Sequence, residues 1–261
     1  MKRLFSNKVS GSDKMHVVYF SCRKHFDYLF LSLKSLAALR SASLGNVYLY
    51  IDKEDFLTEM QMRSLKKLRS DLIVRKREKF SWAGEQTVRV ELQVFKDISE
   101  EIDPEHYVAK VDSDVLFISD DVFASVLKSG DNLLGHKETW CAPFFFTQGG
   151  CYFLKSSFIP QLSDFNKDIF AEVFDKVNNE TMKAKNRSVP GCPEDAVIYS
   201  IARSKTDKIS FIDFYGSSVV HFNERKHEML DFYKSEKMFV YGAKHPFLKI
   251  LPASLRSMLR A

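Results

Sequence analysis

Two aspartates one residue apart, Asp112 and Asp114, lie between two apolar runs of the chain. Residues 106–111 precede them and are predicted to form a buried strand, and residues 115–118 follow at once. Carboxylates among apolar residues are costly unless something neutralises them, and a divalent cation would do so. Mg²⁺ and Mn²⁺ prefer such hard oxygen ligands and usually bridge a few carboxylates to substrate phosphates. The alternative is a surface turn whose aspartates cap backbone amides.

The position of the pair favours a ligand site, because ligands of open α/β sheets bind beyond the carboxyl ends of strands. The elements before the pair alternate, with predicted strands over 16–21, 46–52, 71–74 and 106–111 and predicted helices over 25–40, 56–69 and 84–95. The less regular second half has predicted strands over 132–136, 150–154, 209–214 and 219–222 and helices over 158–178 and 193–202. This alternation predicts an α/β fold with a largely parallel sheet.

Composition and length indicate one large domain. The 261 residues are 45% hydrophobic and 13% aromatic, which suffices for a full core, and no Pro/Gly-rich linker divides them. Four cysteines show no metal-binding spacing and are typical of a reduced, cytosolic protein. We expect no signal peptide, since no apolar segment follows the basic N-terminus before Met15, and no membrane span. No Gly-x-Gly-x-x-Gly follows a predicted strand, which disfavours a dinucleotide-binding unit.

The net charge of +5 is concentrated at the two ends of the chain. Residues 245–261 mix Lys249, Arg256 and Arg260 with apolar residues, and we expect a domain over 1–244 followed by this basic amphipathic tail. Such a segment suits an interfacial helix on an anionic membrane, which would make a cytoplasmic protein peripheral at the inner face of the cytoplasmic membrane. The alternative is a terminal helix docked on the protein's own core. The basic residues form no nucleic-acid-binding motif, so nucleic acid is not an expected partner.

The order of the motifs resembles that of GT-A glycosyltransferases. A strand–helix–strand–helix start leads to Val-Asp-Ser-Asp-Val-Leu-Phe at 111–117, and three further motifs follow: Gln-Gly-Gly-Cys-Tyr-Phe-Leu at 148–154, Pro-Glu-Asp-Ala at 193–196 and Val-His-Phe-Asn at 220–223. The resemblance covers about residues 16–227 and is closest to the bacterial family-8-like galactosyl and glucosyl transferases of lipopolysaccharide assembly. It implies a Rossmann-like, mixed but mainly parallel sheet flanked by helices.

The resemblance implies a metal site on the diphosphate of a nucleotide sugar. Asp112 and Asp114 match the metal-binding pair, and His221 matches a third ligand, which suits Mn²⁺ better than Mg²⁺. The alternative for His221 is a strand-end histidine hydrogen-bonded in the core. Where family-8 enzymes continue with Gly and Lys-Pro-Trp, this chain has Phe-Asn-Glu-Arg-Lys-His, and Lys226 would reach the diphosphate.

Further matches place the donor. Arg89 matches an arginine that touches the donor, the alternative being a solvated helix residue paired with Glu85. The segment Gln148, Gly149 and Gly150 matches the lining of the donor sugar, where glycine lets backbone amides approach a ligand closely; the alternative is a turn. Ser21 and Asp52 end strands where the nucleoside would sit, and Asp52 could equally cap the next helix.

The acceptor side is matched by two acids. Glu194 and Asp195 open a helix, where inverting GT-A enzymes place the general base that deprotonates the acceptor hydroxyl, and Asp195 is our choice for it. In retaining family-8 enzymes the matching position faces the other side of the sugar and has a less settled role. The alternative is a pair of helix N-terminal acids favoured by the helix dipole. Trp82 and the aromatic segment after Trp140 could form a platform for sugar rings, although core packing explains most of these phenylalanines.

These matches predict a metal-dependent glycosyltransferase. It would move a hexose from a nucleotide sugar, UDP-linked by preference, to a hydroxyl of a glycan or lipid-linked acceptor in bacterial cell-surface polysaccharide synthesis. One alternative is a nucleotidyltransferase or other metal-dependent phosphoryl-transfer enzyme, although the expected glycine-rich phosphate loop near the first strand is missing. Another is a GT-A-like binding module without catalysis.

Overall fold

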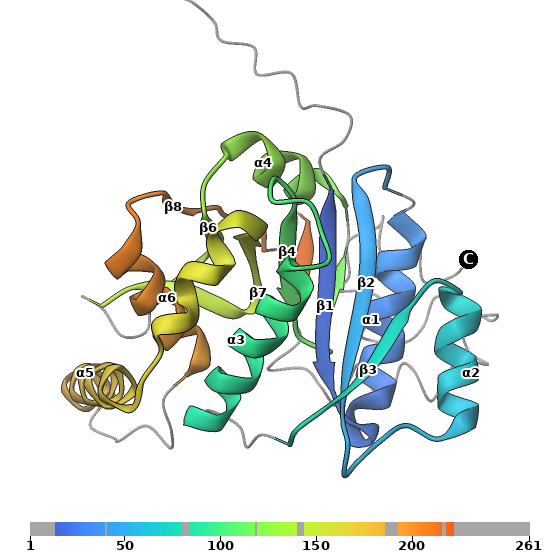
Figure 1. Cartoon of the computed structure of the whole chain (residues 1–261), viewed down its shortest axis with the longest axis horizontal. Coiled ribbons are helices and arrows are strands. Elements are labelled where there is room, and N and C mark those ends of the chain that lie inside the picture. The colour runs from blue at the N-terminus through green and yellow to red at the C-terminus, as the bar shows by residue number, and fades with distance from the viewer. Residues whose placement is uncertain are drawn as a thin grey trace, which may run out of the picture.

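A seven-stranded sheet forms the centre of the computed structural model, which describes residues 14–39, 41–79, 84–117, 119–139, 144–185, 193–215 and 218–221. Its order is β3-β2-β1-β4-β7-β6-β8 (Figure 1). The strands are β1 (Met15–Ser21), β2 (Leu44–Asp52), β3 (Ile73–Arg77), β4 (Tyr107–Val111), β6 (Leu133–Glu138), β7 (Phe146–Lys155) and β8 (Ile209–Phe211). Only β7 runs antiparallel to its neighbours in this sheet. The predicted fold class, a mixed and mainly parallel sheet flanked by helices, is confirmed.

The strand order reverses between β1 and β4. From β1 the chain moves outward to β2 and β3, then returns to pair β4 with the other edge of β1. In open α/β sheets such a reversal is where the connections leave in opposite directions, and ligands bind there, outside the carboxyl ends of the two strands. Asp112 follows β4 directly, and a small antiparallel sheet of β5 (Val115–Phe117) and β9 (Val219–His221) continues from it. The aspartate pair therefore lies at this reversal point.

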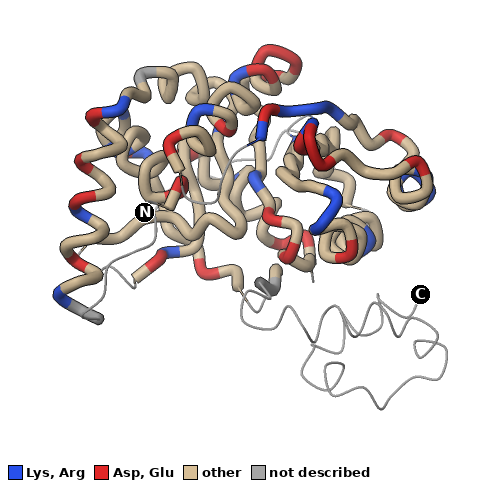
Figure 2. The backbone as a smooth tube through the Cα atoms, turned by 90° about the horizontal axis from the view of Figure 1, so that it is seen from below, with Lys and Arg blue, Asp and Glu red and all other residues tan. Residues whose placement is uncertain are grey.

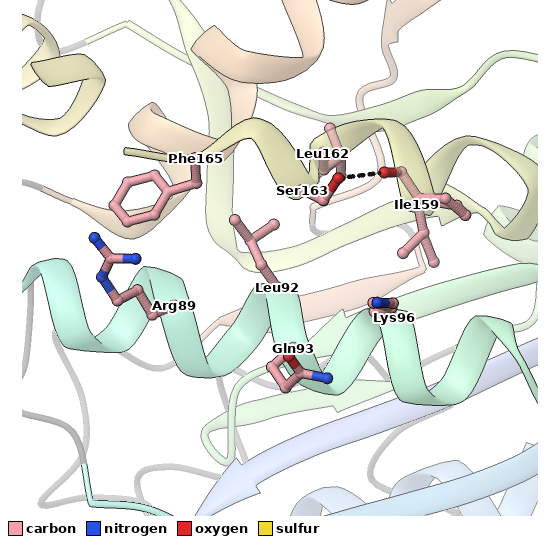
Figure 3. Close-up of a pocket in the computed structure, with 9 residues that line it drawn as sticks. Arg89, Leu92, Gln93, Lys96, Ile159, Leu162, Ser163 and Phe165 are labelled. Atoms are coloured by element: carbon pink, nitrogen blue, oxygen red, sulfur yellow. Dashed lines mark hydrogen bonds between the residues drawn. The ribbon is translucent and has the colours of Figure 1, made fainter. Parts of the chain in front are cut away.

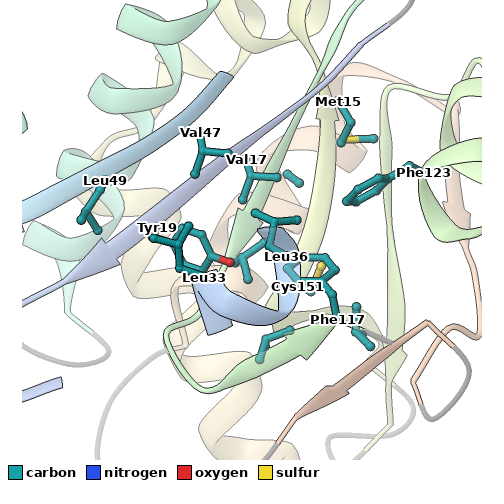
Figure 4. Packing of buried hydrophobic residues seen from close by; sticks show 14 of the residues in the cluster. Met15, Val17, Tyr19, Leu33, Leu36, Val47, Leu49, Phe117, Phe123 and Cys151 are labelled. Carbon is teal, nitrogen blue, oxygen red and sulfur yellow. The ribbon is translucent and has the colours of Figure 1, made fainter. Parts of the chain in front are cut away.

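Helices cover both faces of the sheet (Figure 1). One core cluster joins the sheet to α1 (Phe26–Leu39), α2 (Glu59–Leu68) and α4 (Asp121–Ser129), and Figure 4 shows Val17 and Tyr19 of β1 packed with Leu33 and Leu36 of α1. A second cluster joins the other face to α3 (Glu85–Ser99), η2 (Ser156–Asp164), α5 (Lys167–Lys185) and α6 (Glu194–Lys205). A short 3-10 turn, η1 (Arg23–His25), leads from β1 into α1. Burial of both faces explains why β1, β2 and β4 are continuous apolar runs.

The segment over 158–178, predicted to be mostly helical, forms two helices, η2 and α5. Pro160 lies inside η2, where its missing N–H group and ring oppose a regular α-helix. A new helix begins after Asn166, whose side-chain oxygen accepts the backbone N–H of Ile169 at 2.9 Å, as N-terminal caps do. The break places α5 and α6 side by side on the same face as α3 (Figure 1).

Several sequence-based expectations concern residues outside the described ranges. These are Lys226, the aromatic residues Trp82 and Trp140, and the proposed boundary at 244 with the tail over 245–261. In the described part of the chain, acidic and basic residues are interspersed over the backbone (Figure 2). No helix among the described residues combines the length and apolar character needed to cross a bilayer.

Two histidines, the buried His16 and the partly exposed His106, lie against each other at the amino ends of β1 and β4. The Nδ1 atom of His16 accepts the backbone N–H of Asn46 at 3.0 Å, and its Nε2 atom lies 3.0 Å from Nδ1 of His106. A protonated His16 would lose the bond from Asn46, and burial, followed by the charges of His106 and Lys14, lowers the pKa of His16 to about 4.

We expect this histidine to destabilise the fold in acid. The unfolded chain takes up the proton near pH 6.5, whereas the folded chain does so near pH 4, so stability is complete above pH 6.5 and is lost as the pH falls. The loss should be on the order of 2 kcal/mol after allowance for solvent screening. The free energy of unfolding, measured by urea denaturation at several pH values between 6.5 and 4, should change less steeply with pH in His16→Gln than in the wild-type chain. An unchanged slope would assign the acid sensitivity to other groups.

Candidate active site

The segment from Asp112 to Asp114 forms a tight turn between β4 and β5. The N–H of Asp112 donates to the carbonyl of Gly150 at 2.9 Å, and its own carbonyl accepts the N–H of Val115 at 3.1 Å. Ser113 donates its hydroxyl to the hydroxyl of Ser21 at 3.0 Å, which joins the ends of β1 and β4. Asp114 is 6% exposed. The structure therefore places both aspartates and Ser21 at the point where the strand order reverses.

The glycine pair belongs to a strand and not to a turn, so the turn alternative is wrong. Gln148, Gly149 and Gly150 lie within β7, whose Cys151 pairs with Val111 at the end of β4. A Cβ atom at Gly149 would lie 2.9 Å from Oδ2 of Asp195, closer than real contacts allow. Asp195 also accepts the backbone N–H of Gly149. A glycine is thus required here because a buried carboxyl group lies directly against the backbone.

The acids that open α6 complete this cluster. Pro193 precedes Glu194 and Asp195 at the N-terminus of α6, and Asp195, which is 7% exposed, accepts the N–H of Ala196 at 2.9 Å. Burial, and then the neighbouring charge of Glu194, raise the pKa of Asp195 well above its usual range. Three predicted site residues, Gly149, Glu194 and Asp195, therefore lie together although β7 and α6 are far apart in sequence, and Lys110 joins Asp112 to them.

Lys110 is a site residue that the sequence prediction missed. Its Nζ atom lies 2.7 Å from Oδ1 of Asp112, 2.6 Å from the carbonyl oxygen of Gly149 and 3.6 Å from Oε1 of Glu194. Burial alone lowers the pKa of Lys110, but the charges of Asp112, Glu91 and Glu194 outweigh it and hold that pKa well above the usual value. The ammonium group therefore keeps its charge. The feature of the sequence that could have identified Lys110 is a lysine inside an otherwise apolar strand.

The sequence prediction also missed Glu91 and Tyr152, which lie near the ammonium group of Lys110. Glu91 faces the sheet from α3 and is 2% exposed, and the Tyr152 hydroxyl donates to its Oε2 atom at 3.4 Å. Burial raises the pKa of Glu91 to about 8, although the charge of Lys110 opposes the shift. Glu91 occupies the same helical face as Val88 and Phe95, so an acid on the predicted inward stripe was its signal.

The ends of β2 and β3 contribute polar groups beside Ser21. Asp52 lies opposite Arg77 in the backbone register of β2 and β3. The guanidinium of Arg77 donates to the carbonyl of Ser21 at 3.3 Å. The Oδ1 atom of Asp52 accepts the N–H of Glu54 at 2.8 Å, so Asp52 does cap the following backbone. The helix that follows, α2, has its own cap, Thr58. Ser21 and Asp52 thus lie at the carboxyl ends of β1 and β2, and their role toward a nucleoside stays a prediction.

Arg89 lies in a different place from the acids. It pairs with Glu85 at 2.6 Å, as the alternative predicted, and its guanidinium lies 4.9 Å from the ring centre of Phe165. With Leu92, Lys96 and Ile159 it lines a groove of about 270 Å³ between α3 and η2 (Figure 3). The contacts of Arg89 within the described residues thus do not join it to Asp112, and its role toward a donor stays a prediction.

His221 is placed by its backbone only. In the pairing of β5 with β9 its Cα atom lies opposite Val115, the residue after Asp114. The expected third ligand therefore belongs to the strand next to the aspartate segment. Its role as a ligand stays a prediction, because the described structure does not extend to its side chain.

The donor set fits a hard divalent cation. Asp112 and Glu194 both pair with the ammonium group of Lys110, and each has a second acid close to it in sequence, Asp114 and Asp195. Burial followed by the charges of Asp114 and Glu194 raises the pKa of Asp112 against the opposing effect of Lys110. A dication would relieve this repulsion. Among the described residues no group of three His, Cys, Asp or Glu side chains is arranged to hold a metal. Mg²⁺ and Mn²⁺ commonly need only one or two carboxylates, with substrate phosphates completing the shell.

Comparisons with known proteins give structural likenesses only. No family model and no curated protein sequence matches the chain. The chain is similar to S. aureus TarS 1–349 (14% identity, 94% of this chain and 77% of that chain, TM-score 0.49). It is also similar to the galactosyltransferase LgtC with donor and acceptor sugar analogues (10% identity, 77% and 74%, TM-score 0.47). A third similar structure is the glycosyltransferase GlyE of Streptococcus pneumoniae TIGR4 (13% identity, TM-score 0.47), with 77% of this chain covering 46% of GlyE.

GlyE and LgtC are glycosyl-transferring enzymes by description, the class that the sequence motifs resemble. Identities of 14% or less and TM-scores below 0.5 do not establish a shared activity. A functional conclusion must therefore come from the residues at the crevice.

Proposed function

We propose that this chain is a metal-dependent glycosyltransferase, which moves a hexose from a nucleotide sugar, UDP-linked by preference, to a hydroxyl of a glycan acceptor. One observation carries the proposal: at the reversal point of the sheet Lys110 pairs with Asp112 and Glu194, Asp195 lies against Gly149, and Asp114 is buried two residues after Asp112. An acidic crevice repels a diphosphate unless a cation intervenes, and it offers both metal ligands and a base. A phosphoryl-transfer enzyme is less well supported, because β1 leads into η1 and α1 without any glycine between residues 16 and 44.

Asp112 and Asp114 would hold Mn²⁺ or Mg²⁺, with His221 and Lys226 as proposed further contacts to the ion and the diphosphate. When bound, the ion supplies Lewis-acid stabilisation of the charge that develops on the departing nucleoside diphosphate. Ser21 and Asp52 lie at the ends of β1 and β2, where the nucleoside would be bound, and Arg77 donates to the carbonyl of Ser21. The backbone of Gln148, Gly149 and Gly150 would line the sugar.

Asp195 is the proposed general base. The carboxylate would take the proton of the acceptor hydroxyl while the acceptor oxygen bonds to the anomeric carbon and the bond from that carbon to the diphosphate oxygen breaks. The N–H groups of Gly149 and Ala196 fix the carboxyl group for this role. Because burial raises its pKa, the group is a stronger base than an exposed aspartate once it is ionised. Glu194 shapes the charge around it.

A screen of nucleotide sugars tests this proposal. The purified full chain is incubated with UDP-, GDP- and CMP-linked sugars, with Mn²⁺ or with a chelator, and release of the nucleotide is measured with and without simple glycan acceptors. We expect slow hydrolysis and faster transfer of at least one UDP-hexose with Mn²⁺ only. Nucleotide release that ignores the chelator, or none from any donor, would contradict the proposal.

We further propose that residues 245–261 hold the enzyme at the inner face of the cytoplasmic membrane, beside a lipid-linked acceptor of cell-surface polysaccharide synthesis. Each basic residue near an anionic leaflet contributes about 1 kcal/mol, and salt screens the attraction. The full chain should therefore sediment with anionic liposomes at low salt, and removal of residues 252–261 should reduce this while transfer to a soluble acceptor continues. Unfolding of the truncated chain, or no binding by the full chain, would instead indicate a docked terminal helix.

A further inference from the structure

The ammonium group of Lys110 connects three separate elements. It extends from β4 to the carbonyl of Gly149 in β7 at 2.6 Å and to Glu194 at the start of α6 at 3.6 Å, and it binds Asp112 at 2.7 Å. Only 2% of the residue is exposed. The side chains of its two acidic partners are more accessible, at 39% for Asp112 and 17% for Glu194, whereas the lysine itself is buried, so removing its ammonium group would take a buried donor from all three partners. The three partners are thus fixed relative to one atom.

Asp195 depends on the same connection indirectly. The carbonyl of Gly149 accepts from Lys110, while the N–H of Gly149 donates to Asp195. The peptide groups on both sides of Gly149 therefore lie between the ammonium group and the proposed base. A shift of the Gly149 backbone would move Asp195 away from its donor and would alter the distance between the base and Asp112.

We propose that Lys110 is a positioning residue that sets Asp112, the Gly149 backbone and Glu194 in one fixed arrangement before any ligand binds. The inference rests on the proposed function for its catalytic consequence, but its structural consequence is independent of it. Catalytic groups displaced by about 1 Å can lose roughly a hundredfold in rate, so a positioning residue acts on turnover more than on donor affinity.

The test compares Lys110→Met with Lys155→Met. Lys155 is a matched control because it lies at the end of β7, pairs with Glu105 at 2.8 Å and contacts none of the site residues named above. In Lys110→Met we expect kcat for transfer to fall about a hundredfold, as such displacements do, with less than about a threefold rise in KM for the donor. In Lys155→Met both constants should stay at the wild-type level.

Hydrogen exchange supplies a measurement that requires no activity. Loss of the ammonium should raise exchange of the amides of Gly149 and Ala196 at least tenfold, while amides of β1 and β2 stay protected. If Lys110→Met does not fold, Lys110→Arg is used, because a planar guanidinium keeps the charge but cannot place one nitrogen among three oxygen atoms. It should show the same local loss of protection.

Unchanged kcat together with unchanged exchange at Gly149 in a folded Lys110 variant would overturn the inference. A uniform loss of protection across the sheet, with kcat and KM unchanged at low temperature, would also overturn it, since it would show a purely structural role. If the wild-type chain shows no transfer at all, the proposed function fails, and the exchange data alone still decide whether Lys110 positions the cluster.

Discussion

Replacing Asp114 with asparagine is expected to remove transfer activity almost completely, by about a thousandfold or more, and to abolish metal-dependent binding of nucleoside diphosphate. Asparagine keeps the shape of the side chain but loses its charge, so an ion shared with a diphosphate would lose one of its two protein carboxylates. Asp114 is buried beside Asp112, whose pKa it raises. Removing this repulsion should leave the melting temperature of the metal-free chain unchanged or higher.

A matched control for this variant is Asp207→Asn. Asp207 lies on the surface, where it pairs with Arg203 at 2.9 Å and is 94% exposed. An exposed pair contributes little to stability, so this change should affect neither stability nor activity. If Asp114→Asn turned over donor at the wild-type rate, or if it lost activity only because it unfolded, Asp114 would be a structural residue and the metal site would be wrong.

The second large effect is expected from Asp195→Asn, which should lower kcat by about a hundredfold to ten-thousandfold with little change in donor affinity. The wild-type enzyme should also lose activity in acid. The carboxyl group must be ionised to accept a proton, and its pKa lies well above the usual range. Activity should therefore increase as the pH rises through this raised pKa, and it should be low at every pH below it. Profiles of kcat/KM against pH for both proteins would show whether the variant loses this limb.

The control for Asp195 is another acid in the first turn of a helix. Asp121 opens α4 and accepts the hydroxyl of Ser119 at 2.8 Å, so Asp121→Asn should cost about 0.3–1 kcal/mol of stability through the helix dipole and leave kcat unchanged. If Asp195→Asn behaved in the same way, the two acids of α6 would only be helix N-terminal residues.

The fold is predictable from sequence where one physical signal dominates. The strands β1, β2 and β4 are short apolar runs because helices cover both faces of the sheet, and the carboxyl end of β4 carries the acids. The antiparallel direction of β7 is not predictable, since the hydrophobic pattern of a strand is the same whichever way the strand runs in the sheet. The two glycines of β7 are typical of a turn in the local sequence. The structure needs glycine at position 149 because Asp195, which is distant in sequence, lies against its backbone, and nothing in the local sequence shows this contact.

The acids that lie at strand and helix ends were predictable from the sequence, whereas the buried Lys110 and Glu91 were not. Asp112, Asp114 and Asp195 carry local signals, a strand end and a helix start, and the structure brings them to one crevice. Lys110 and Glu91 become interpretable only when β4, β7, α3 and α6 are assembled, because their partners are distant in sequence. Arg89 illustrates the opposite case: its near neighbour Glu85 satisfies it locally, four residues away on the same helix.

The most direct test of the central claim is calorimetric titration of the full chain with UDP, with Mn²⁺ present and after its removal by a chelator. The acidic crevice should bind UDP only in the presence of Mn²⁺, and Asp112→Asn and Asp114→Asn should each remove this binding, whereas Asp207→Asn should retain it. Binding of UDP that is equally tight without any divalent ion, or retained in both aspartate variants, would contradict a metal-dependent nucleotide-sugar site at this crevice.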